Sequence, residues 1–281
     1  MECAAAQATF LESMFQVYQS RSESRAIWSE WLRSRHGGRI SWELRFDKSM
    51  TENEKLVFFE DLRKLKTSMP IAYVLGEIIW ADIKWKVDER ALIPRPETEE
   101  LLQAVLREVN PSDRIVDACT GSGCIAIATK LKVPSTHLIA FDLSSDALSL
   151  AEENADSKNV QIDWYKSNLL EPIPDWVSSG GDDIWVSNPP YIPVSEILDK
   201  SLGFEPDMAL YVSDDNPIIY YQKIIKWSLK GLKKGGFLFF EVHSDFCFEI
   251  KIHLENQNKW SEIKIIDDDC GKHRFIKAVR E

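Results

Sequence analysis

Apolar residues recur with a helical period through the first seventy positions. Three runs place apolar side chains three or four residues apart, which is the spacing of one buried face of a helix. Pro70 closes the stretch, because proline stops a helix. The pattern predicts a small helical domain over residues 1–70 whose aromatic side chains form a core rather than a ligand site. Its apolar residues are Phe10, Leu11, Met14, Phe15 and Tyr18, then Ile27, Trp28, Trp31 and Leu32, then Leu56, Val57, Phe58, Leu62 and Leu65.

The hydrophobic pattern changes over residues 71–93. From Ile83 to Val87 apolar and polar residues alternate, which is typical of a strand with one exposed face. An apolar run ends just before it, at Trp80, so we predict a β-hairpin linker that turns near Ala81 and Asp82. Two prolines follow, and a helix with acidic residues in its first turn is predicted to start at about Pro96.

From Arg114 onward, short apolar runs alternate with helical stretches, which predicts an α/β domain over residues 94–281. We expect a Rossmann-like, mostly parallel sheet that ends in an antiparallel pair of strands. The predicted strands are 115–117, 138–141, 160–165, 183–187 and 237–242, with the antiparallel pair at 263–266 and 274–279. Helices are predicted from Cys124 and over 146–154 and 218–232, a turn over 233–236, and a long irregular connection over 192–217.

A glycine-rich turn follows the first strand of this domain. Asp117 ends that strand, and Gly121 and Gly123 allow positive φ and close approach of a ligand at a helix N-terminus. Asp142 ends the next strand, one strand-helix-strand unit later, where a carboxylate can accept hydrogen bonds from both hydroxyls of a ribose. Together these features predict a site for an adenosine-containing ligand. Ser167, Asn168 and Leu169 end the third strand, where they can meet the edge and face of an adenine ring.

The fourth strand runs directly into Asn188, Pro189, Pro190 and Tyr191. Prolines carry no N–H and keep the residue before them extended, so this segment offers carbonyl oxygens without competing donors. The Asn188 side chain adds a further carbonyl, and Tyr191 an aromatic face. A site so rich in acceptors suits a planar –NH2 group, as in an amide or an aromatic amine.

The composition is that of a water-soluble globular protein, with a net charge of −11. The charge is uneven, since residues 1–70 carry about +1 and the rest about −12. Because tracking a nucleic-acid backbone needs a basic surface, direct binding of nucleic acid is not expected. Without a signal-peptide pattern or an apolar run of about 18 residues, we expect a cytoplasmic protein with no membrane partner. The five cysteines lack metal-ligand spacing, so reduced thiols and no metal are expected.

Several motifs together resemble those of a known family. The glycine turn, Asp142 and the Asn-Pro-Pro-Tyr segment look like the motifs of class I S-adenosylmethionine methyltransferases. The segment from Leu92 to Glu99, with Phe204, Glu205 and Pro206, resembles the release factor glutamine methyltransferases, the HemK/PrmC family. The resemblance runs from about Pro70 to Val279. It implies a class I methyltransferase fold and N5-methylation of the glutamine in the Gly-Gly-Gln loop of class 1 peptide chain release factors, by a chain expected to be a monomer.

The resemblance also implies roles for individual residues. S-adenosyl-L-methionine is expected to be bound by Asp117, Cys119, Thr120, Gly121, Ser122, Gly123, Asp142, Leu143, Asn168, Leu169 and Asn188. The catalytic and substrate-binding residues are expected to be Asn188, Pro189, Pro190 and Tyr191, with Arg95 and Glu205 also binding substrate. Residues 1–70 are expected to recognise the protein substrate. One departure is Cys119, where many members of the family have glycine.

The residues leave three alternatives open. The exocyclic amines of adenine and cytosine would suit the same acceptors, so an amino-methyltransferase acting on a nucleic-acid base is one. Gly121, Gly123 and Ala126 also fit a dinucleotide fingerprint, which would indicate an NAD-dependent oxidoreductase. The third is a protein-binding module that keeps the fold without catalysis.

Overall fold

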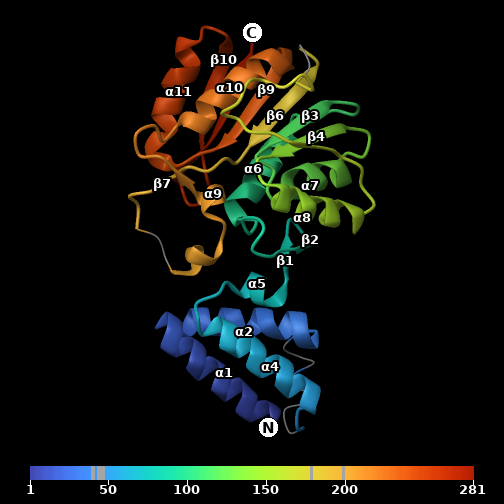
Figure 1. The fold of residues 1–281 in the computed structure, drawn as a ribbon, viewed down its shortest axis with the longest axis vertical. Coiled ribbons are helices and arrows are strands. Elements are labelled where there is room, and N and C mark those ends of the chain that lie inside the picture. Colours follow the sequence, from blue (N-terminus) through green and yellow to red (C-terminus); the bar gives the residue numbers. More distant parts are fainter. Residues whose placement is uncertain (39–41, 43–47, 178–179, 198–199) are drawn as a thin grey trace. The chain divides into compact units, whose positions relative to one another are not determined.

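The computed structural model describes the chain except for residues 39–41, 43–47, 178–179 and 198–199, and the described part divides into two units. The first holds Met1–Ile78 together with the short 3-10 helix η1 (Lys200–Phe204). The second holds Ile79–Ile197 and Glu205–Glu281 (Figure 1). Each unit has its own hydrophobic core.

The first unit is helical, as its apolar period predicted. It contains α1 (Cys3–Tyr18), α2 (Arg21–His36), α4 (Glu52–Leu65) and the short α5 (Ile71–Leu75). Thr51 begins α4 with a capping box, since its hydroxyl accepts the Glu54 N–H and its own N–H donates to the Glu54 carboxylate at 2.7 Å. Ser20 caps α2 in the same sense by accepting the Glu23 N–H.

The aromatic side chains of this unit form its core, which confirms the interpretation of the apolar runs. Trp28 stacks on Trp31 with ring centroids 5.2 Å apart, and Phe10 lies 4.9 Å from Trp28. One carboxylate is buried beside them. Asp61 accepts hydrogen bonds from Trp31 Nε1 at 2.9 Å and from two nitrogens of Arg35 at 2.9 and 3.2 Å. The buried carboxylate therefore ties α4 to α2.

A β-hairpin follows α5. Its strands are β1 (Glu77–Trp80) and β2 (Ile83–Lys86), and the turn lies at Ala81 and Asp82, where it was predicted. Both turn residues have positive φ, 52° and 60°, as a two-residue type I′ turn requires.

A seven-stranded sheet forms the centre of the second unit. Its order is β10-β11-β9-β6-β3-β4-β5, and the five strands from β9 to β5 are parallel. Only β11 runs against its neighbours, so the Rossmann-like sheet with an antiparallel C-terminal strand is confirmed. The strands are β3 (Arg114–Ala118), β4 (His137–Asp142), β5 (Asp163–Lys166), β6 (Asp182–Ser187), β9 (Leu232–Glu241), β10 (Trp260–Asp267) and β11 (His273–Arg280).

Helices cover both faces of this sheet (Figure 1). One layer contains α6 (Pro96–Leu106), α7 (Cys124–Lys132) and α8 (Ser145–Asp156), and the other contains α10 (Ile219–Gly231) and α11 (Cys247–Asn256). Because both faces are covered, the central strands are continuous apolar runs. Trp185 and Phe240 are fully buried members of this core. Pro96 is the first residue of α6, as predicted.

Three local predictions were wrong. The strand predicted from Val160 begins only at Asp163, because the Val160 N–H donates to Ala155 O and so completes the end of α8. The predicted turn at 233–236 is the start of β9, where the register against β6 shifts and Gly235 takes a φ of 79°. The described part of the 192–217 connection also contains short elements, namely β7 (Ile192–Pro193), η1, α9 (Asp207–Leu210) and β8 (Tyr211–Val212).

Across the described ranges, no helix is both long and apolar enough to cross a bilayer.

Replacing Asp61 with alanine should destabilise the helical unit by roughly 2–4 kcal/mol, because Trp31 Nε1 and Arg35 lose their acceptor in a buried setting. Asp61→Asn can still accept from Trp31 and should lose about half as much. Urea unfolding followed by tryptophan fluorescence measures both variants. Equal stability of Asp61→Ala and the parent chain would show that this carboxylate does not hold α2 against α4.

Candidate active site

A pocket opens where the parallel strands of the second unit end. Its empty volume is about 970 Å³, open solvent at the mouth included, which is large enough for a nucleotide-sized ligand. Most of the predicted site residues line it, although they come from five separate segments. They are Arg95, Cys119, Thr120, Gly121, Ser122, Asp142, Leu143, Asn168, Leu169, Asn188 and Pro190. Five other predicted residues are not among the lining residues, namely Asp117, Gly123, Pro189, Tyr191 and Glu205.

The two glycines of the turn serve different purposes. Gly121 has a φ of 55°, and a Cβ there would meet nothing within 4 Å, so the missing side chain leaves space for a ligand. Gly123 has a φ of 80° and caps α7, and a Cβ there would lie 2.9 Å from Ile127 Cδ1 and 3.0 Å from Ala151 Cβ. Gly123 is therefore required by packing between α7 and α8.

Cys119 occupies the left-handed region, with a φ of 58°. A side chain at such a φ costs about 1–2 kcal/mol, which the surrounding core must offset. Burial raises the pKa of the Cys119 thiol well above its usual value, so this cysteine stays a protonated, unreactive thiol.

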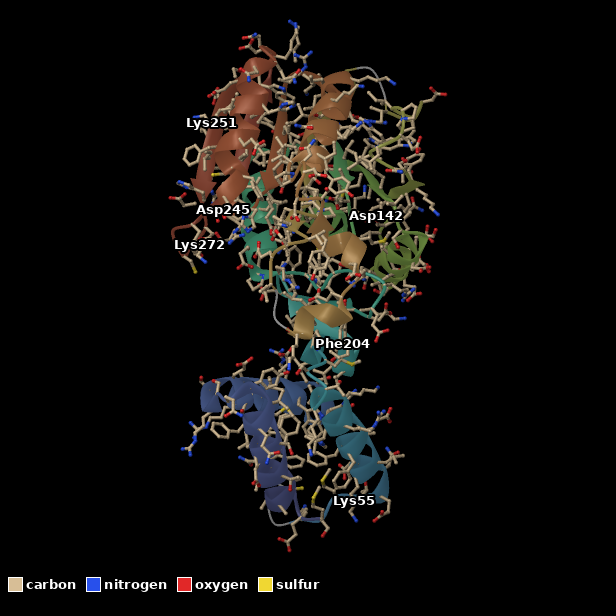
Figure 2. All side chains as sticks on the ribbon, turned by 60° about the vertical axis from the view of Figure 1, so that its left-hand side comes forward. Lys55, Asp142, Phe204, Asp245, Lys251 and Lys272 are labelled. Atoms are coloured by element: carbon tan, nitrogen blue, oxygen red, sulfur yellow. The ribbon has the colours of Figure 1, made fainter. Side chains whose placement is uncertain are left out.

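Asp142 ends β4 beside the turn (Figure 2). One carboxylate oxygen accepts the Gly121 N–H at 2.9 Å and the other accepts the Ser144 N–H at 2.9 Å. Burial raises the pKa of Asp142, while these backbone donors lower it. Each carboxylate oxygen can accept more than one hydrogen bond, so the group can still receive two ligand hydroxyls.

Asp117 is fully buried beneath the same turn. Its Oδ2 accepts from Thr120 Oγ1 at 2.6 Å and from the Ala126 N–H at 3.2 Å. Its Oδ1 has no hydrogen-bond partner among the described residues. Burial raises the pKa of Asp117 to about 7, against the lowering effect of the two hydrogen bonds. A buried acceptor with spare capacity suits a nearby cationic group, which would stabilise the ionised form.

The wall of the pocket next to Asp142 combines apolar surface with one amide. Leu143 is 44% exposed and Leu169 is buried, so both offer apolar contact to a flat ring. Asn168 Oδ1 accepts the Leu170 N–H at 2.9 Å. That bond directs the oxygen toward the backbone and leaves the –NH2 group of Asn168 to meet a ligand.

Burial and hydrogen bonds hold residues 188–191, the segment after β6, in place. Ser187 Oγ donates to Ala118 O at 2.6 Å, and Pro189 and Pro190 are buried. Asn188 is half-buried and donates from Nδ2 to Thr98 Oγ1 at 3.2 Å. The Tyr191 hydroxyl donates to Glu241 Oε1 at 3.3 Å, and burial raises its pKa, so it remains protonated.

Arg95 and Glu205 form one contact. Arg95 Nη2 lies 2.5 Å from Glu205 Oε1, and Glu205 Oε2 accepts the Ile93 N–H at 3.0 Å. The Glu205 side chain is almost completely buried, and the residues after it, Pro206, Met208 and Ala209, line the pocket. The pair therefore joins two segments that line the pocket.

Sequence reasoning missed several polar residues of the site, and two of them are bonded to the segment after β6. Thr98 lines the pocket, and Glu241 lies buried directly behind it, with Thr98 Oγ1 donating to Glu241 Oε2 at 2.7 Å. Glu241 could have been predicted from the sequence, because it follows a continuous apolar run at the end of a strand, as Asp117 and Asp142 do. Thr98 gave no comparable signal, since its place depends on how α6 packs. In the part of the chain that is described, no group of His, Cys, Asp and Glu side chains could hold a metal ion.

The chain resembles several characterised proteins. The family described as methyltransferase small domain matches residues 97–199. The release factor glutamine methyltransferase of Enterococcus faecalis is 36% identical over 261 residues, which cover 91% of this chain and 92% of that protein. The protein of the same name from Bacteroides thetaiotaomicron is 32% identical over 82% of this chain and 81% of its own length. A methyltransferase structure from Pyrococcus furiosus shares the fold with a TM-score of 0.53 at 16% identity, over 82% of this chain and 98% of that one.

The two glycines predict a contrast in stability. Gly123→Ala should cost roughly 2–5 kcal/mol, because strain at positive φ adds to the clash with Ile127 and Ala151. Gly121→Ala has similar strain but open space around the Cβ, so it should cost roughly 1 kcal/mol. Urea unfolding of the two variants is the measurement. A Gly121 variant as unstable as the Gly123 variant would contradict the different purposes given to the two residues.

Proposed function

This chain belongs to the release factor glutamine methyltransferases, and on that premise we propose that it methylates the N5 amide of the glutamine in the Gly-Gly-Gln motif of class 1 peptide chain release factors. The methyl donor is S-adenosyl-L-methionine, the cofactor of the family. One observation carries the proposal most directly. Asn188 and Pro190, from the acceptor-rich segment, line the same pocket as Gly121 and Asp142, so an amide and an adenosine ligand can meet there.

For the cofactor, we assign binding to the turn and the two strand ends beside it. Asp142 would accept the ribose hydroxyls, and Leu143, Asn168 and Leu169 would hold the adenine. The turn of Cys119, Thr120, Gly121, Ser122 and Gly123 would hold the methionine part, with Asp117 below it. The chain fits this ligand, because a Cβ is missing where the ligand must approach Gly121 and Asp117 keeps a buried acceptor for a cationic amino group.

For the substrate, Asn188 Oδ1 and the Pro189 carbonyl would accept the two hydrogens of the glutamine amide. An amide nitrogen is a weak nucleophile, because its lone pair is delocalised into the carbonyl. Two acceptors orient the nitrogen and favour localisation of that lone pair, so catalysis rests on positioning and fixed dipoles. The cofactor supplies an electrophilic sulfonium methyl group. Methyl transfer would form a nitrogen–carbon bond and break the sulfur–carbon bond, whose electron pair would stay on sulfur, and one amide proton would be lost to water.

Pro190, Tyr191, Arg95 and Glu205 would complete the substrate site. Pro190 lines the pocket, and Tyr191 supplies an aromatic edge whose hydroxyl is fixed on Glu241. Arg95 and Glu205 would act by holding two lining segments of the pocket together, because the Glu205 carboxylate is already occupied by Arg95 and the Ile93 N–H.

We further propose that residues 1–70 recognise the release factor, and that the enzyme acts as a monomer in the cytoplasm. The helical unit has its own aromatic core and a net charge near zero, unlike the acidic remainder. All five cysteines are free thiols, which suits a reducing compartment.

The substrate is tested by transfer of labelled methyl from S-adenosylmethionine to a purified release factor, its Gln→Ala variant and bare RNA. We expect label only on the intact factor, and a short Gly-Gly-Gln peptide should be a much poorer substrate, because remote contacts orient the amide. Equal label on the Gln→Ala factor, or label on RNA, would overturn the proposed function. The RNA sample matters because base amines would suit the same acceptors.

Two variants should separate chemistry from cofactor binding. Asn188→Ala should lower kcat more than about 10-fold, equivalent to a barrier increase above ~1.4 kcal/mol, with cofactor affinity much less changed. Asp142→Asn should weaken cofactor binding by roughly 10-fold or more, since it loses a charged acceptor of ribose hydroxyls. Calorimetry with S-adenosylhomocysteine and steady-state kinetics measure the two effects. Unchanged affinity in a folded Asp142 variant would remove Asp142 from the cofactor site.

A fragment of residues 77–281 tests the helical unit. It should still bind S-adenosylhomocysteine, because it retains every lining residue of the pocket. Its kcat/KM with intact release factor should fall by roughly 10-fold or more, because recognition energy is lost. If the fragment methylates the factor at the full rate, residues 1–70 do not recognise substrate.

A further inference from the structure

A chain of two hydrogen bonds leads from Asn188 into the protein interior. Asn188 Nδ2 lies 3.2 Å from Thr98 Oγ1, and Thr98 Oγ1 lies 2.7 Å from Glu241 Oε2. Thr98 is 3% exposed and Glu241 is 1% exposed, so water does not compete for these bonds. The proposed function leaves both residues unexplained.

Secondary structure fixes all three positions. In the parallel pairing of β6 with β9, Ser187 lies opposite Phe240. The next residues, Asn188 just after β6 and Glu241 at the end of β9, therefore lie side by side. Thr98 is the third residue of α6, whose start is set by Pro96. The hydroxyl of Thr98 is thereby placed between the amide and the carboxylate.

The chemistry of the three groups fixes which group donates and which accepts in these two hydrogen bonds. A carboxylate can only accept hydrogen bonds, and a threonine hydroxyl has one hydrogen to donate. Thr98 therefore gives its hydrogen to Glu241 and presents a lone pair to Asn188. Asn188 therefore donates to Thr98 from its –NH2 group. Its Oδ1 remains available to accept a hydrogen bond in the pocket.

We propose that Thr98 and Glu241 are positioning residues that hold the Asn188 side chain with its carbonyl oxygen toward the substrate amide. This inference rests on the proposed function, in which Oδ1 accepts a hydrogen from the glutamine amide. If the Asn188 amide were reversed, its –NH2 group would face the –NH2 group of the substrate and could not accept from it. Glu241 acts through Thr98 rather than on the substrate, because Glu241 is buried and is not among the lining residues of the pocket.

Other groups hold the Glu241 carboxylate in its place. Tyr191 donates to Oε1 at 3.3 Å, while Thr98 occupies Oε2. Burial raises the pKa of Glu241 to about 7. The hydrogen bond from Thr98, the positive charge of Arg274 and the hydrogen bond from Tyr191 each lower this pKa. The negative charge of Glu97 raises it slightly. Glu241 therefore changes its protonation state near neutral pH.

Protonation of Glu241 would allow the donor and acceptor roles in the two hydrogen bonds to reverse. A neutral carboxyl can donate to Thr98, and the Thr98 hydroxyl can then donate to Oδ1 of a reversed Asn188. The ionised form is thus the competent one. We expect kcat at saturating cofactor to be low below pH 7, to rise through about pH 7 and to level off above it.

Three variants test the proposal by kinetics. Glu241→Gln keeps the shape but can donate to Thr98, and Thr98→Val removes the hydroxyl at nearly constant volume. Each should lower kcat about 10-fold or more, with S-adenosylhomocysteine affinity within about 3-fold of the parent value, and each should lose the rise near pH 7. Thr98→Ser restores the hydroxyl and should keep at least about a third of kcat and the pH profile. Thr136→Val is the matched control, because it removes another buried threonine hydroxyl, which donates to Val133 O. Neither Thr136 nor Val133 lines the pocket, so kcat of this variant should not change.

A second measurement does not need the protein substrate. The side-chain –NH2 resonances of Asn188, assigned by their loss in Asn188→Asp, should shift with pH around 7 in the parent chain and not in Glu241→Gln or Thr98→Val. Parent-like resonances in Thr98→Val, parent-like kcat in Glu241→Gln, or equal losses in Thr98→Ser and Thr98→Val would each overturn the proposal. If the release factor receives no methyl group but the resonances behave as expected, the proposed substrate is wrong while the positioning of Asn188 stands.

Discussion

The parallel pairing of β6 with both β3 and β9 is the constraint on which the site depends. It places Ser187 opposite Ala118 on one side and opposite Phe240 on the other. The chain leaving β6 therefore emerges between the glycine turn and Glu241. No loop conformation alone would achieve this, because the glycine turn and Glu241 lie more than a hundred residues apart in the sequence, with Asn188 between them. The register of the sheet brings these distant segments into contact. A slip of one residue in β6 would turn the Asn188 side chain to the other face of the sheet.

Three buried carboxylates follow from the same geometry. Asp117, Asp142 and Glu241 each stand at or near the carboxyl end of a parallel strand, and burial raises the pKa of all three. Each is compensated by hydroxyl or backbone donors rather than by a direct salt bridge. The arrangement concentrates negative charge around the pocket, which favours a positively charged ligand such as S-adenosylmethionine. It also explains how a chain with a net charge of −11 can bind this cofactor without a basic surface.

The site has little need of acid–base chemistry of its own. Its polar groups are acceptors and donors whose directions are fixed by hydrogen bonds within the protein, as with Asn168 on Leu170 and Asn188 on Thr98. Such preorganised dipoles act on a reacting amide without first having to reorient. The substrate must then come to the pocket already aligned. That requirement is the physical reason for proposing that residues 1–70 recognise the substrate, and that the ion pair of Arg95 and Glu205 fixes the shape of the pocket.

The sequence by itself determined most of the longer helices, the order of the predicted strands, and many of the residues that line the pocket. Glycine and proline restrict backbone geometry locally, so the turn at 119–123 and the segment at 188–191 could be recognised without knowing their neighbours. Strand ends in a parallel sheet meet at one edge, so their convergence could be expected too. Only the tertiary structure decided the start of β5, the bulge in β9, and the partnership of Asn188, Thr98 and Glu241. Those features depend on register and on packing between distant elements, and hydrophobic periodicity along the chain carries no information about either.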